Sequence, residues 1–449
     1  MMMVIGGGPA GRIAAMELAQ GRREGEDVIL VEKRTAGLGG QCTHAGCMVV
    51  CALNDVARHL AQARMFYEDG IVTTPVSISY PHIIDGLYDV QKKLSSIMRA
   101  ETTDTGVKLL SGDARVSGRM VIVNGEVYTP DSLLIATGSV PFIPAILGNE
   151  LQGIYTAHTL LEKRELPSRL VIIGGGVVAV EFAYIFAQFG VQVTIVARST
   201  LLREYTEYIV SGVRADLSDV SILEEAVVQA CVETMPGTGI VGSVTVLVDG
   251  KEQSLPADMV LFAAGNRPNT AMIEGISLNA DGEIVVNERM ETSVPHVYAA
   301  GDVCGSPYLT PYARYEGRAA ASAMLGKPLP PRPKIVPQAI KLHYEHGWCD
   351  SPDSDLDSDV SHAAMPSLVG SGSLWKIGHT STGRSVLSSH SDGTIASMYE
   401  SSPVGSLAAA YMGYLIERDV TVQELAMMLE VHPSPDGMHW LAKYFASRS

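Results

Sequence analysis

Two short apolar runs, each followed by a cluster of glycines and then a helical pattern, are the clearest features of the chain. The first run is residues 2–5, followed by a glycine-rich turn at 6–11 and a helical pattern to about residue 20. The second is residues 170–173, followed by a similar turn at 174–179 and a helical run over 180–189. Each pattern predicts a strand, a tight turn and a helix, as in units that hold a dinucleotide pyrophosphate at a helix N-terminus. Two such units imply electron transfer between two cofactors.

The first unit contains the features that a dinucleotide needs. Gly6 allows the turn, Gly8 lets the backbone approach the pyrophosphate, and Gly11 lets the helix pack on the strand. A further apolar run at 28–31 predicts the second strand. That strand ends at Glu32, about 20 residues beyond the glycines, where a carboxylate accepts hydrogen bonds from a ribose.

The second unit differs at the corresponding position. Its next strand, predicted at 192–196, ends in Ala197, whereas NAD(H) with a free 2′-hydroxyl would favour an acid there. Arg198 and Arg203 follow, and arginine forms bidentate, charge-assisted hydrogen bonds with phosphate oxygens. We therefore expect NADP(H) in preference to NAD(H). The alternative is that both arginines are solvated surface residues.

The last third of the chain has a different character. Residues 328–337 hold five prolines, which is typical of a linker. Beyond them come strand-like runs and two helical stretches, at 406–416 and 421–429. Five aspartates occur within 350–359, but Ser358 stands where a calcium loop needs glycine, so we interpret this segment as a solvated acidic loop.

Composition limits the classes of function. A chain of 449 residues is too long for one ordinary core and suggests about three domains. A net charge of −16 argues against nucleic acid and anionic membrane surfaces, which need clustered Lys and Arg. Six cysteines in so long a chain suit a reducing cytoplasm and one catalytic pair. We find neither a run of eighteen apolar residues nor a basic segment before the first strand, so no membrane span or signal peptide is expected.

Cys42 and Cys47 are the candidates for chemistry. They follow the first nucleotide-binding unit, and the glycine pair before them lets the backbone pass close to a ligand. Cys47 begins a helical run that continues over 48–64, whose dipole is expected to lower the pKa of its thiol. We expect a redox-active thiol pair beside a cofactor; the alternative is two buried structural cysteines.

The segment that contains these cysteines resembles the redox-active disulfide segment of the FAD-dependent pyridine nucleotide-disulfide oxidoreductases, the family of dihydrolipoamide dehydrogenase, glutathione reductase and mercuric reductase. The resemblance covers essentially the whole chain. It implies an α/β fold with an FAD-binding domain at 1–149 and 266–330, an NAD(P)H-binding domain at 150–265 and a C-terminal α+β interface domain at 331–449. The two nucleotide-binding domains are expected to be Rossmann-like, and the protein a homodimer.

The resemblance also implies roles for individual residues. Hydride passes from nicotinamide to flavin, the reduced flavin opens the disulfide through Cys47, and Cys42 exchanges with a small disulfide or dithiol. The segment around His432 is similar to the family's C-terminal His-Pro motif, so this imidazole is expected to act as acid and base at the partner subunit's disulfide. Glu181 matches the family glutamate beside flavin and nicotinamide, although an ordinary helix-interior acid is the alternative.

The resemblance implies two sets of cofactor contacts. Those for FAD are Gly6, Gly8, Pro9, Ala10, Gly11, Glu32, Lys33, Gly40, Gln41, Cys42, Ala136, Thr137, Gly138, Gly301 and Asp302. Those for NADP(H) are Gly174, Gly176, Ala179, Glu181, Arg198, Arg203 and Gly265. No metal ligands are expected.

Three departures from the family pattern concern this site. The lysine that pairs with the family glutamate is replaced by Cys51, so Glu181 is either protonated or has another partner. Cys51 itself is a small buried side chain or a third redox or metal-binding sulfur. The glutamate that orients the histidine falls at Gly437, with Asp436 one position out of register.

We therefore expect a cytoplasmic, homodimeric FAD flavoenzyme that is nearest in layout to dihydrolipoamide dehydrogenase. It passes electrons between NADP(H) and a small disulfide or dithiol, and it needs neither nucleic acid nor a membrane. The alternatives are an NAD-dependent dihydrolipoamide dehydrogenase and a redox-sensing flavoprotein with little turnover. A mercuric reductase is disfavoured because the last residues, 446–449, contain no vicinal cysteine pair.

Overall fold

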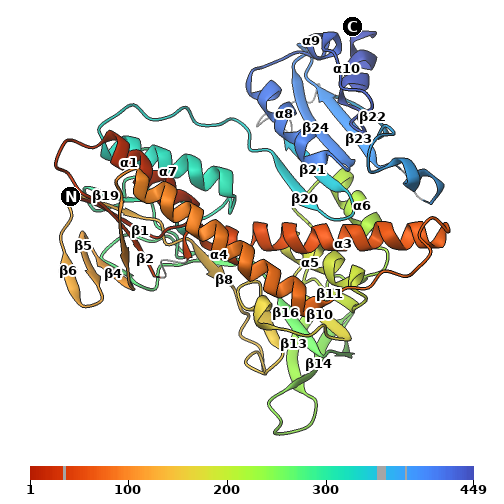
Figure 1. Cartoon of the computed structure of the whole chain (residues 1–449), viewed down its shortest axis with the longest axis horizontal. Helices are drawn as coiled ribbons and strands as arrows, with labels where there is room; N and C mark the ends of the chain where they lie inside the picture. The colour runs from red at the N-terminus through yellow and green to blue at the C-terminus, as the bar shows by residue number, and fades with distance from the viewer. Residues whose placement is uncertain (34–36, 351–359, 380–381, 449) are drawn as a thin grey trace.

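The computed structural model of the protein describes residues 1–33, 37–350, 360–379 and 382–448. Figure 1 shows three bodies of secondary structure, joined by two long helices near the centre. We call them the first, second and third domains in the order in which their central strands occur along the chain.

The first domain is built on a parallel sheet covered on both faces. Its strand order is β19-β7-β1-β2-β3, and every pairing is parallel. Strands covered on both faces need continuous apolar runs, and all four residues of β1 are buried. The sheet strands are β1 (Met2–Ile5), β2 (Val28–Glu32), β3 (Lys108–Ser111), β7 (Ser132–Ile135) and β19 (Val297–Ala299).

Helices cover one face of this sheet and a small second sheet covers the other. Helices α1 (Pro9–Gly21) and α7 (Thr310–Met324) pack together on the first face through small residues such as Gly317. The second sheet contains β4 (Ala114–Ser117), β5 (Met120–Val123), β6 (Glu126–Tyr128) and β18 (Ile273–Glu274). A short 3-10 helix, η3 (Asp302–Cys304), follows β19.

The second domain repeats the parallel arrangement. Its strand order is β12-β11-β10-β16-β9, again with parallel pairing throughout. The strands are β9 (Ile154–Thr156), β10 (Arg169–Ile173), β11 (Gln192–Val196), β12 (Ser221–Leu223) and β16 (Met259–Phe262), and the helices are η2 (Leu160–Glu162), α5 (Val177–Gln188) and α6 (Glu207–Asp216). An antiparallel sheet of β13 (Val227–Glu233), β14 (Val241–Val248) and β15 (Lys251–Pro256) packs beside it. β8 (Ser139–Pro141) and β17 (Asn266–Pro268) pair where the chain passes between the domains.

The third domain is an antiparallel sheet with helices on one face. Its strand order is β20-β21-β24-β23-β22. The strands are β20 (Gln338–Lys341), β21 (Glu345–Asp350), β22 (Ser361–Pro366), β23 (Arg384–Ser389) and β24 (Ile395–Ser402), and the helices are η4 (Leu374–Gly378), α8 (Gly405–Glu417), α9 (Val422–Met427) and α10 (Met438–Ala446). The predicted acidic loop at 351–359 lies outside the described residues.

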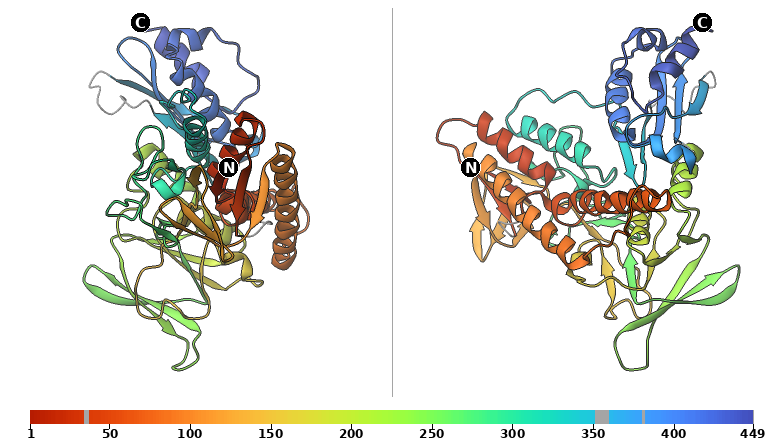
Figure 2. Two further views of the ribbon diagram at one scale, coloured as in Figure 1. Left: turned by 90° about the vertical axis from the view of Figure 1, so that its left-hand side faces the viewer. Right: turned by 45° about the vertical axis from the view of Figure 1, so that its right-hand side comes forward.

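Long helices connect the three domains. The short helix α2 (Gly40–His44) leads into α3 (Cys47–Glu68), and α4 (Tyr80–Asp104) returns the chain to the first domain. Figures 1 and 2 show α3 running between the second and third domains. One hydrophobic cluster accordingly contains residues of α3, α5 and the start of the third domain, among them Leu53, Phe182 and Ile340. Packing of α3 therefore places its N-terminus at the junction of the domains.

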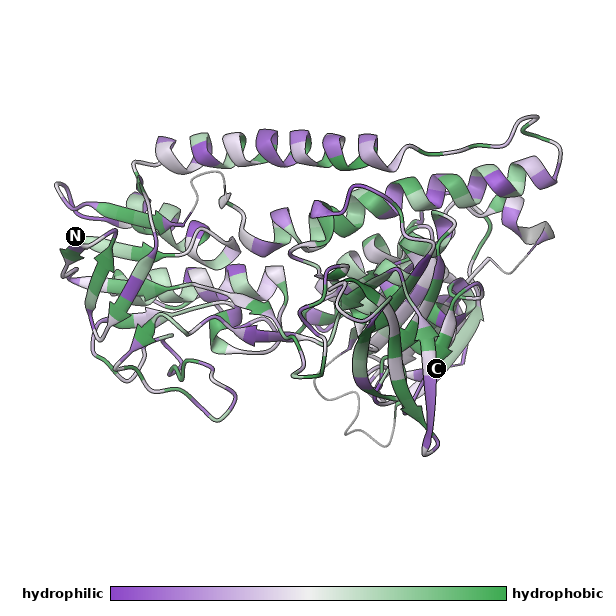
Figure 3. Ribbon diagram, turned by 90° about the horizontal axis from the view of Figure 1, so that it is seen from below, coloured by the Kyte–Doolittle hydropathy of each residue, from purple (hydrophilic) through white to green (hydrophobic). Residues whose placement is uncertain are grey.

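Figure 3 shows apolar residues gathered on the strands and polar residues along the outer faces of the helices. Among the residues that the structure describes, no helix combines the length and apolar character needed to cross a bilayer. The predicted α/β class with parallel sheets is confirmed. Strands at 2–5 and 192–196 have the predicted bounds, whereas the sequence analysis did not predict α4 and α10.

Candidate active site

The turn after β1 has no room for any residue but glycine at two positions. Gly6 has φ +105°, and a Cβ atom there would lie 2.2 Å from the carbonyl oxygen of Ala136 at the end of β7. A Cβ atom on Gly11 would lie 2.0 Å from the carbonyl oxygen of Gly6. The start of α1, with Pro9 as its first residue, is thus pressed against the turn, and its free N–H groups are available to a phosphate.

Two other predicted FAD segments, those of Gly40 and Gly301, converge on this turn. A Cβ atom on Gly40 would lie 2.8 Å from the Cα atom of Gly8, and one on Gly301 would lie 3.0 Å from the Cβ atom of Ala10. Both glycines have positive φ, +59° and +80°. Side chains at these positions would fill the space in front of α1, so the small residues keep a cradle open for a ligand. Its shape and donors suit the pyrophosphate of FAD.

Glu32 and Lys33 differ in their surroundings. The backbone N–H of Gly7 donates to Glu32 Oε2 at 2.7 Å, which places the carboxylate at the turn where a ribose-binding acid is expected. Lys33 is 67% exposed and forms an ion pair with Asp113 at 2.9 Å. Its predicted contact with FAD stays a prediction.

Asp302 lies in a hydrogen-bond network that sequence alone did not reveal. The Ser139 hydroxyl donates to Asp302 Oδ2 at 2.8 Å and lies 3.3 Å from Gln41 Oε1. Burial raises the pKa of Asp302. The network joins three predicted FAD segments, since Ser139 directly follows Gly138. Thr137 is also tied in, because its hydroxyl donates to the Asn269 carbonyl at 2.8 Å.

Cys47 lies at the N-terminal end of α3 and beside that of α7, and Cys42 precedes it in α2. Cys42 is in α2, Cys47 is the first residue of α3, and both are free thiols. Cys47 Sγ lies 3.8 Å from the hydroxyl of Thr310, the first residue of α7. Helix N-termini stabilise thiolates. The contribution of α7 was missed from sequence because Thr310 is 263 residues from Cys47.

The pKa values of the pair differ from the sequence expectation. The pKa of Cys42 is lowered to about 6, first because Cys47 hydrogen-bonds to its sulfur; burial opposes this, and Thr310 and Arg314 of α7 assist it. The same hydrogen bond raises the pKa of Cys47. The expectation of a lowered pKa for Cys47 is therefore wrong, because the hydrogen bond to Cys42 and burial both raise it. These directions favour Cys42 over Cys47 as the thiolate of the reduced pair.

Glu181 and Cys51 lie close to this pair. Glu181, on α5, accepts a hydrogen bond from the backbone N–H of Lys341 at 3.1 Å, and burial raises its pKa to about 8. Cys51 is half-buried one helical turn beyond Cys47, and burial also raises its pKa. Within the described parts of the chain, no group of three or more His, Cys, Asp or Glu is arranged to hold a metal ion.

The turn after β10 repeats the geometry of the first turn. A Cβ atom on Gly174, where φ is +140°, would lie 2.1 Å from the carbonyl oxygen of Ala263, and one on Gly175 would lie 2.8 Å from the Ala197 Cβ atom. Gly176 caps α5, in which Ala179 is fully buried, and Gly265 has φ +104°. Ala197, which directly follows β11, therefore lies against the turn.

Both predicted phosphate-binding arginines are exposed beside this turn. Arg203 is 60% exposed and lies 3.3 Å from Glu204, while the Leu202 N–H donates to the Gly175 carbonyl and ties the arginine loop to the turn. A nearby acid, Glu224, is engaged by the side chain of Arg214. Its negative charge is thus offset by an arginine that the sequence analysis did not consider.

His432 is exposed in the segment between α9 and α10. The Asp436 carboxylate has other partners: it accepts hydrogen bonds from the Tyr411 hydroxyl at 3.0 Å and from the Met438 N–H at 2.9 Å. A Cβ atom on Gly437 would lie 2.6 Å from Ser385 Oγ. The family glutamate is therefore incompatible with the packing of α10 on β23.

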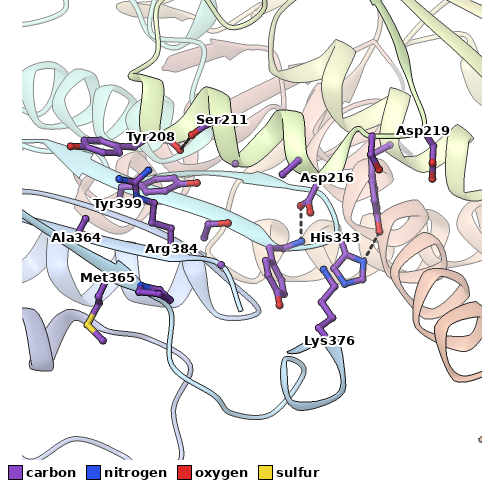
Figure 4. Close-up of a pocket in the computed structure, with 18 of the residues that line it drawn as sticks. Tyr208, Ser211, Asp216, Asp219, His343, Ala364, Met365, Lys376, Arg384 and Tyr399 are labelled. Atoms are coloured by element: carbon purple, nitrogen blue, oxygen red, sulfur yellow. Dashed lines mark hydrogen bonds between the residues drawn. The ribbon is translucent and has the colours of Figure 1, made fainter. Parts of the chain in front are cut away.

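A cavity of about 620 Å³ lies between α6 and the sheet of the third domain, and no predicted site residue lines it. Figure 4 shows Asp216, His343 and Lys376 gathered at one end of it. Asp216 Oδ2 accepts hydrogen bonds from the Tyr344 N–H at 2.9 Å and from His346 Nε2 at 3.0 Å. Burial opposes ionisation of Asp216, yet the hydrogen bond and the charge of His346 keep its pKa below the usual value. The network ties α6 to β21, and we interpret it as a contact between domains.

The sequence of the chain is similar to those of known proteins. Residues 1–317 match the model of the family described as pyridine nucleotide-disulphide oxidoreductase. The chain is 28% identical to dihydrolipoyl dehydrogenase of Geobacillus stearothermophilus over 453 residues, covering 96% of this chain and 93% of that protein. It is 32% identical to dihydrolipoyl dehydrogenase of Acholeplasma laidlawii over 336 residues, covering 72% and 96%.

A solved structure has the same fold. The HOCl-induced flavoprotein disulfide reductase RclA of Escherichia coli superposes with a TM-score of 0.85 over 99% of both chains, at 22% identity.

Proposed function

We propose that NADPH is the electron donor of this protein and that a small disulfide is its electron acceptor. The chain belongs to the pyridine nucleotide-disulphide oxidoreductase family. The chain is an FAD-dependent disulfide oxidoreductase, an enzyme that acts on sulfur groups. The observation that carries the proposal is the pair of free thiols beside the glycine cradle, Cys42 in α2 and Cys47 at the start of α3, with the pKa of Cys42 lowered to about 6.

The chemistry proceeds by thiol–disulfide exchange. When bound, FAD supplies a carrier of two electrons. Two electrons and one proton convert the Cys42–Cys47 disulfide into a Cys42 thiolate and a Cys47 thiol. The Cys42 thiolate attacks a substrate disulfide, forms a mixed disulfide and releases the first substrate thiolate. Cys47 then displaces the second, which restores the Cys42–Cys47 disulfide.

We propose that His432 of the partner subunit protonates the departing thiolates. An imidazole side chain suits this role because it can donate and accept a proton near neutral pH. In a single chain His432 is exposed, and the apolar side chains before it are more exposed than expected for a monomer: Met427 83%, Leu429 95% and Val431 81%. A second copy that covers these side chains would bring the histidine to the other subunit's thiols.

Each proposed domain limit falls between two elements of secondary structure. Limits at 149/150, 265/266 and 330/331 fall between β8 and β9, between β16 and β17, and between α7 and β20. We also propose a cytoplasmic location, since all six cysteines are free thiols, and a reducing compartment keeps the catalytic pair reducible.

Two alternatives have specific support. An NAD-dependent dihydrolipoyl dehydrogenase is favoured by the names of the relatives at 28% and 32% identity. A redox-sensing flavoprotein with little turnover is favoured by Gly437, which leaves His432 without the family's orienting glutamate.

An anaerobic titration separates enzyme from sensor. Purified protein is reduced with NADPH while the flavin spectrum is recorded, and lipoamide, cystine and glutathione disulfide are then added in turn. We expect at least one of them to reoxidise the flavin rapidly and to support steady turnover. A flavin that is reduced by NADPH but reoxidised slowly by every disulfide would identify the sensor.

Arg198 and Arg203 are expected to determine the choice of nucleotide. One well-formed hydrogen bond to a phosphate contributes about 1.5 to 3 kcal/mol, so NADPH should be favoured over NADH by roughly tenfold or more in kcat/KM. The double variant Arg198→Ala with Arg203→Ala should lose this preference, whereas Lys251→Ala, which removes an exposed cation from the same domain, should keep it. A wild-type protein that prefers NADH would favour the NAD-dependent alternative.

A further inference from the structure

We propose that Lys341, on β20 of the third domain, is a positioning residue that supplies to Glu181 the cation that is missing from position 51 of α3. The inference rests on the proposed function, because it takes Glu181 to act beside the flavin and nicotinamide. It adds to that function a residue from a different domain, 160 positions from the glutamate that it serves.

One face of α3 contacts β20 and the start of β21, the segment that contains Lys341. Cys51, Asn54 and Arg58 recur at helical spacing and therefore lie on the same face. The Asn54 side chain, 1% exposed, donates to the carbonyl of Leu342 at 3.2 Å. Arg58 Nη1 lies 3.5 Å from Glu345 Oε1. These two contacts hold β20 and the start of β21 along α3, so that Cys51 lies beside Lys341.

Glu181 approaches the same residue from α5. Its Oε1 atom accepts a hydrogen bond from the Lys341 backbone N–H at 3.1 Å, which fixes the carboxylate against the end of β20. Burial raises the pKa of Glu181, and Lys341 lowers it through both this hydrogen bond and its charge. Burial also raises the pKa of Cys51, and the charge of Lys341 is the first effect that opposes it. The positive charge of the Lys341 ammonium therefore lowers the pKa of both side chains.

The ammonium itself is held in place. Lys341 Nζ donates to Glu345 Oε1 at 3.1 Å, and Glu345 is also bound by the backbone N–H of Ser406 at 3.1 Å. The cluster contains two cations, Lys341 and Arg58, and two carboxylates, Glu181 and Glu345. Removal of Lys341 would take one positive charge from this partly buried cluster, which favours the protonated form of Glu181.

Groups from several elements face Glu181 and would contribute to its titration. They are Cys47 and Cys51 from α3, Lys341 from β20 and Tyr205 from the segment before α6.

Lys341→Met is the central variant. It should slow flavin reduction by NADPH roughly 10- to 100-fold, because a charged partner near the reacting ring is lost. Lys341→Arg should retain most of the rate, since it conserves the charge. Lys334→Met is the matched control, because Lys334 lies in the same domain but pairs with Asp419 at 2.9 Å on the surface. Melting temperature and FAD content, measured for every variant, identify any that fail to fold.

Rescue from another position separates charge from packing. Adding Cys51→Lys to Lys341→Met places a lysine on α3 beside the lost one. Flavin reduction by NADPH should then be at least about tenfold faster than in Lys341→Met alone. A purely structural role of Lys341 would not be restored by a cation from a different helix. Absence of rescue in a folded, FAD-containing double variant would overturn the proposal.

Titration of the apoprotein provides a readout that needs no turnover. The infrared carbonyl band of protonated Glu181, identified by its loss in Glu181→Gln, is followed against pH. Lys341→Met should move its midpoint upward by about one pH unit or more. An unchanged midpoint would contradict the inference even if disulfides are reduced normally. Conversely, a shifted midpoint in a protein that reduces no disulfide would support the effect of Lys341 on Glu181 and would overturn only the proposed function.

Discussion

Cys42→Ser is expected to lower disulfide turnover by roughly 10⁴-fold or more while keeping a long-wavelength charge-transfer band, whereas Cys47→Ser is expected to lose both turnover and band. In the proposed assignment, the first variant lacks the nucleophile that attacks the substrate and the second lacks the sulfur beside the flavin. The hydrogen bond with Cys42 is the largest cause of the raised Cys47 pKa. A serine at position 42 can instead donate to Cys47, so that Cys47 becomes the thiolate donor to oxidised flavin.

Absorption spectra of the resting variants, together with steady-state turnover, test this assignment. Cys51→Ala, one turn further along α3, is the matched control and should retain turnover with substrate disulfides. Equal spectra for Cys42→Ser and Cys47→Ser would rule out the assigned roles.

Alkylation of the reduced enzyme with iodoacetamide gives an independent check. Only the thiolate reacts, so the rate at Cys42 should be half-maximal near its pKa of about 6 and should fall as the pH drops below that value.

His432→Ala is expected to leave flavin reduction by NADPH intact and to slow disulfide turnover by roughly 10² to 10⁴. The proton that the leaving thiolate needs would then come from water instead of a positioned imidazole. Stopped-flow measurement of flavin reduction and steady-state measurement of turnover separate the two steps. His362→Ala, which removes another exposed histidine of the third domain, should change neither rate.

Mixed dimers reveal whether the histidine acts across the interface. Subunits with Cys42→Ser and subunits with His432→Ala are each inactive in their own homodimers. In the mixed dimer the intact Cys42 of one subunit meets the intact His432 of the other, so random mixing should recover about a quarter of the wild-type turnover. Recovery of no activity from verified mixed dimers, or a fully active monomer, would contradict a histidine that acts on the partner.

Local patterns in the sequence were sufficient to predict the nucleotide-binding turns. Gly6 and Gly174 stand where a Cβ atom would collide with the carbonyl oxygens of Ala136 and Ala263, and this requirement is visible as glycine at a fixed distance from an apolar run. The position of the cysteines, after the first nucleotide-binding unit and at the start of a helical run, likewise predicted a redox-active thiol pair. Helices α4 and α10 were not predicted, since neither follows a glycine turn or another motif that drew attention to it.

What only the tertiary structure decided is the environment of these groups. Cys47 meets Thr310, Ser139 meets Asp302, and Glu181 meets Lys341, at separations of 263, 163 and 160 residues. No periodicity in the chain marks such pairs, because they arise from packing between elements that are far apart in the sequence. The pKa of Cys47, expected to be lowered by its own helix, is raised by a hydrogen bond to a neighbouring thiol. The sequence determined which groups are available for chemistry, whereas the tertiary structure determined their charges, because electrostatic interactions depend on distance in space and on burial.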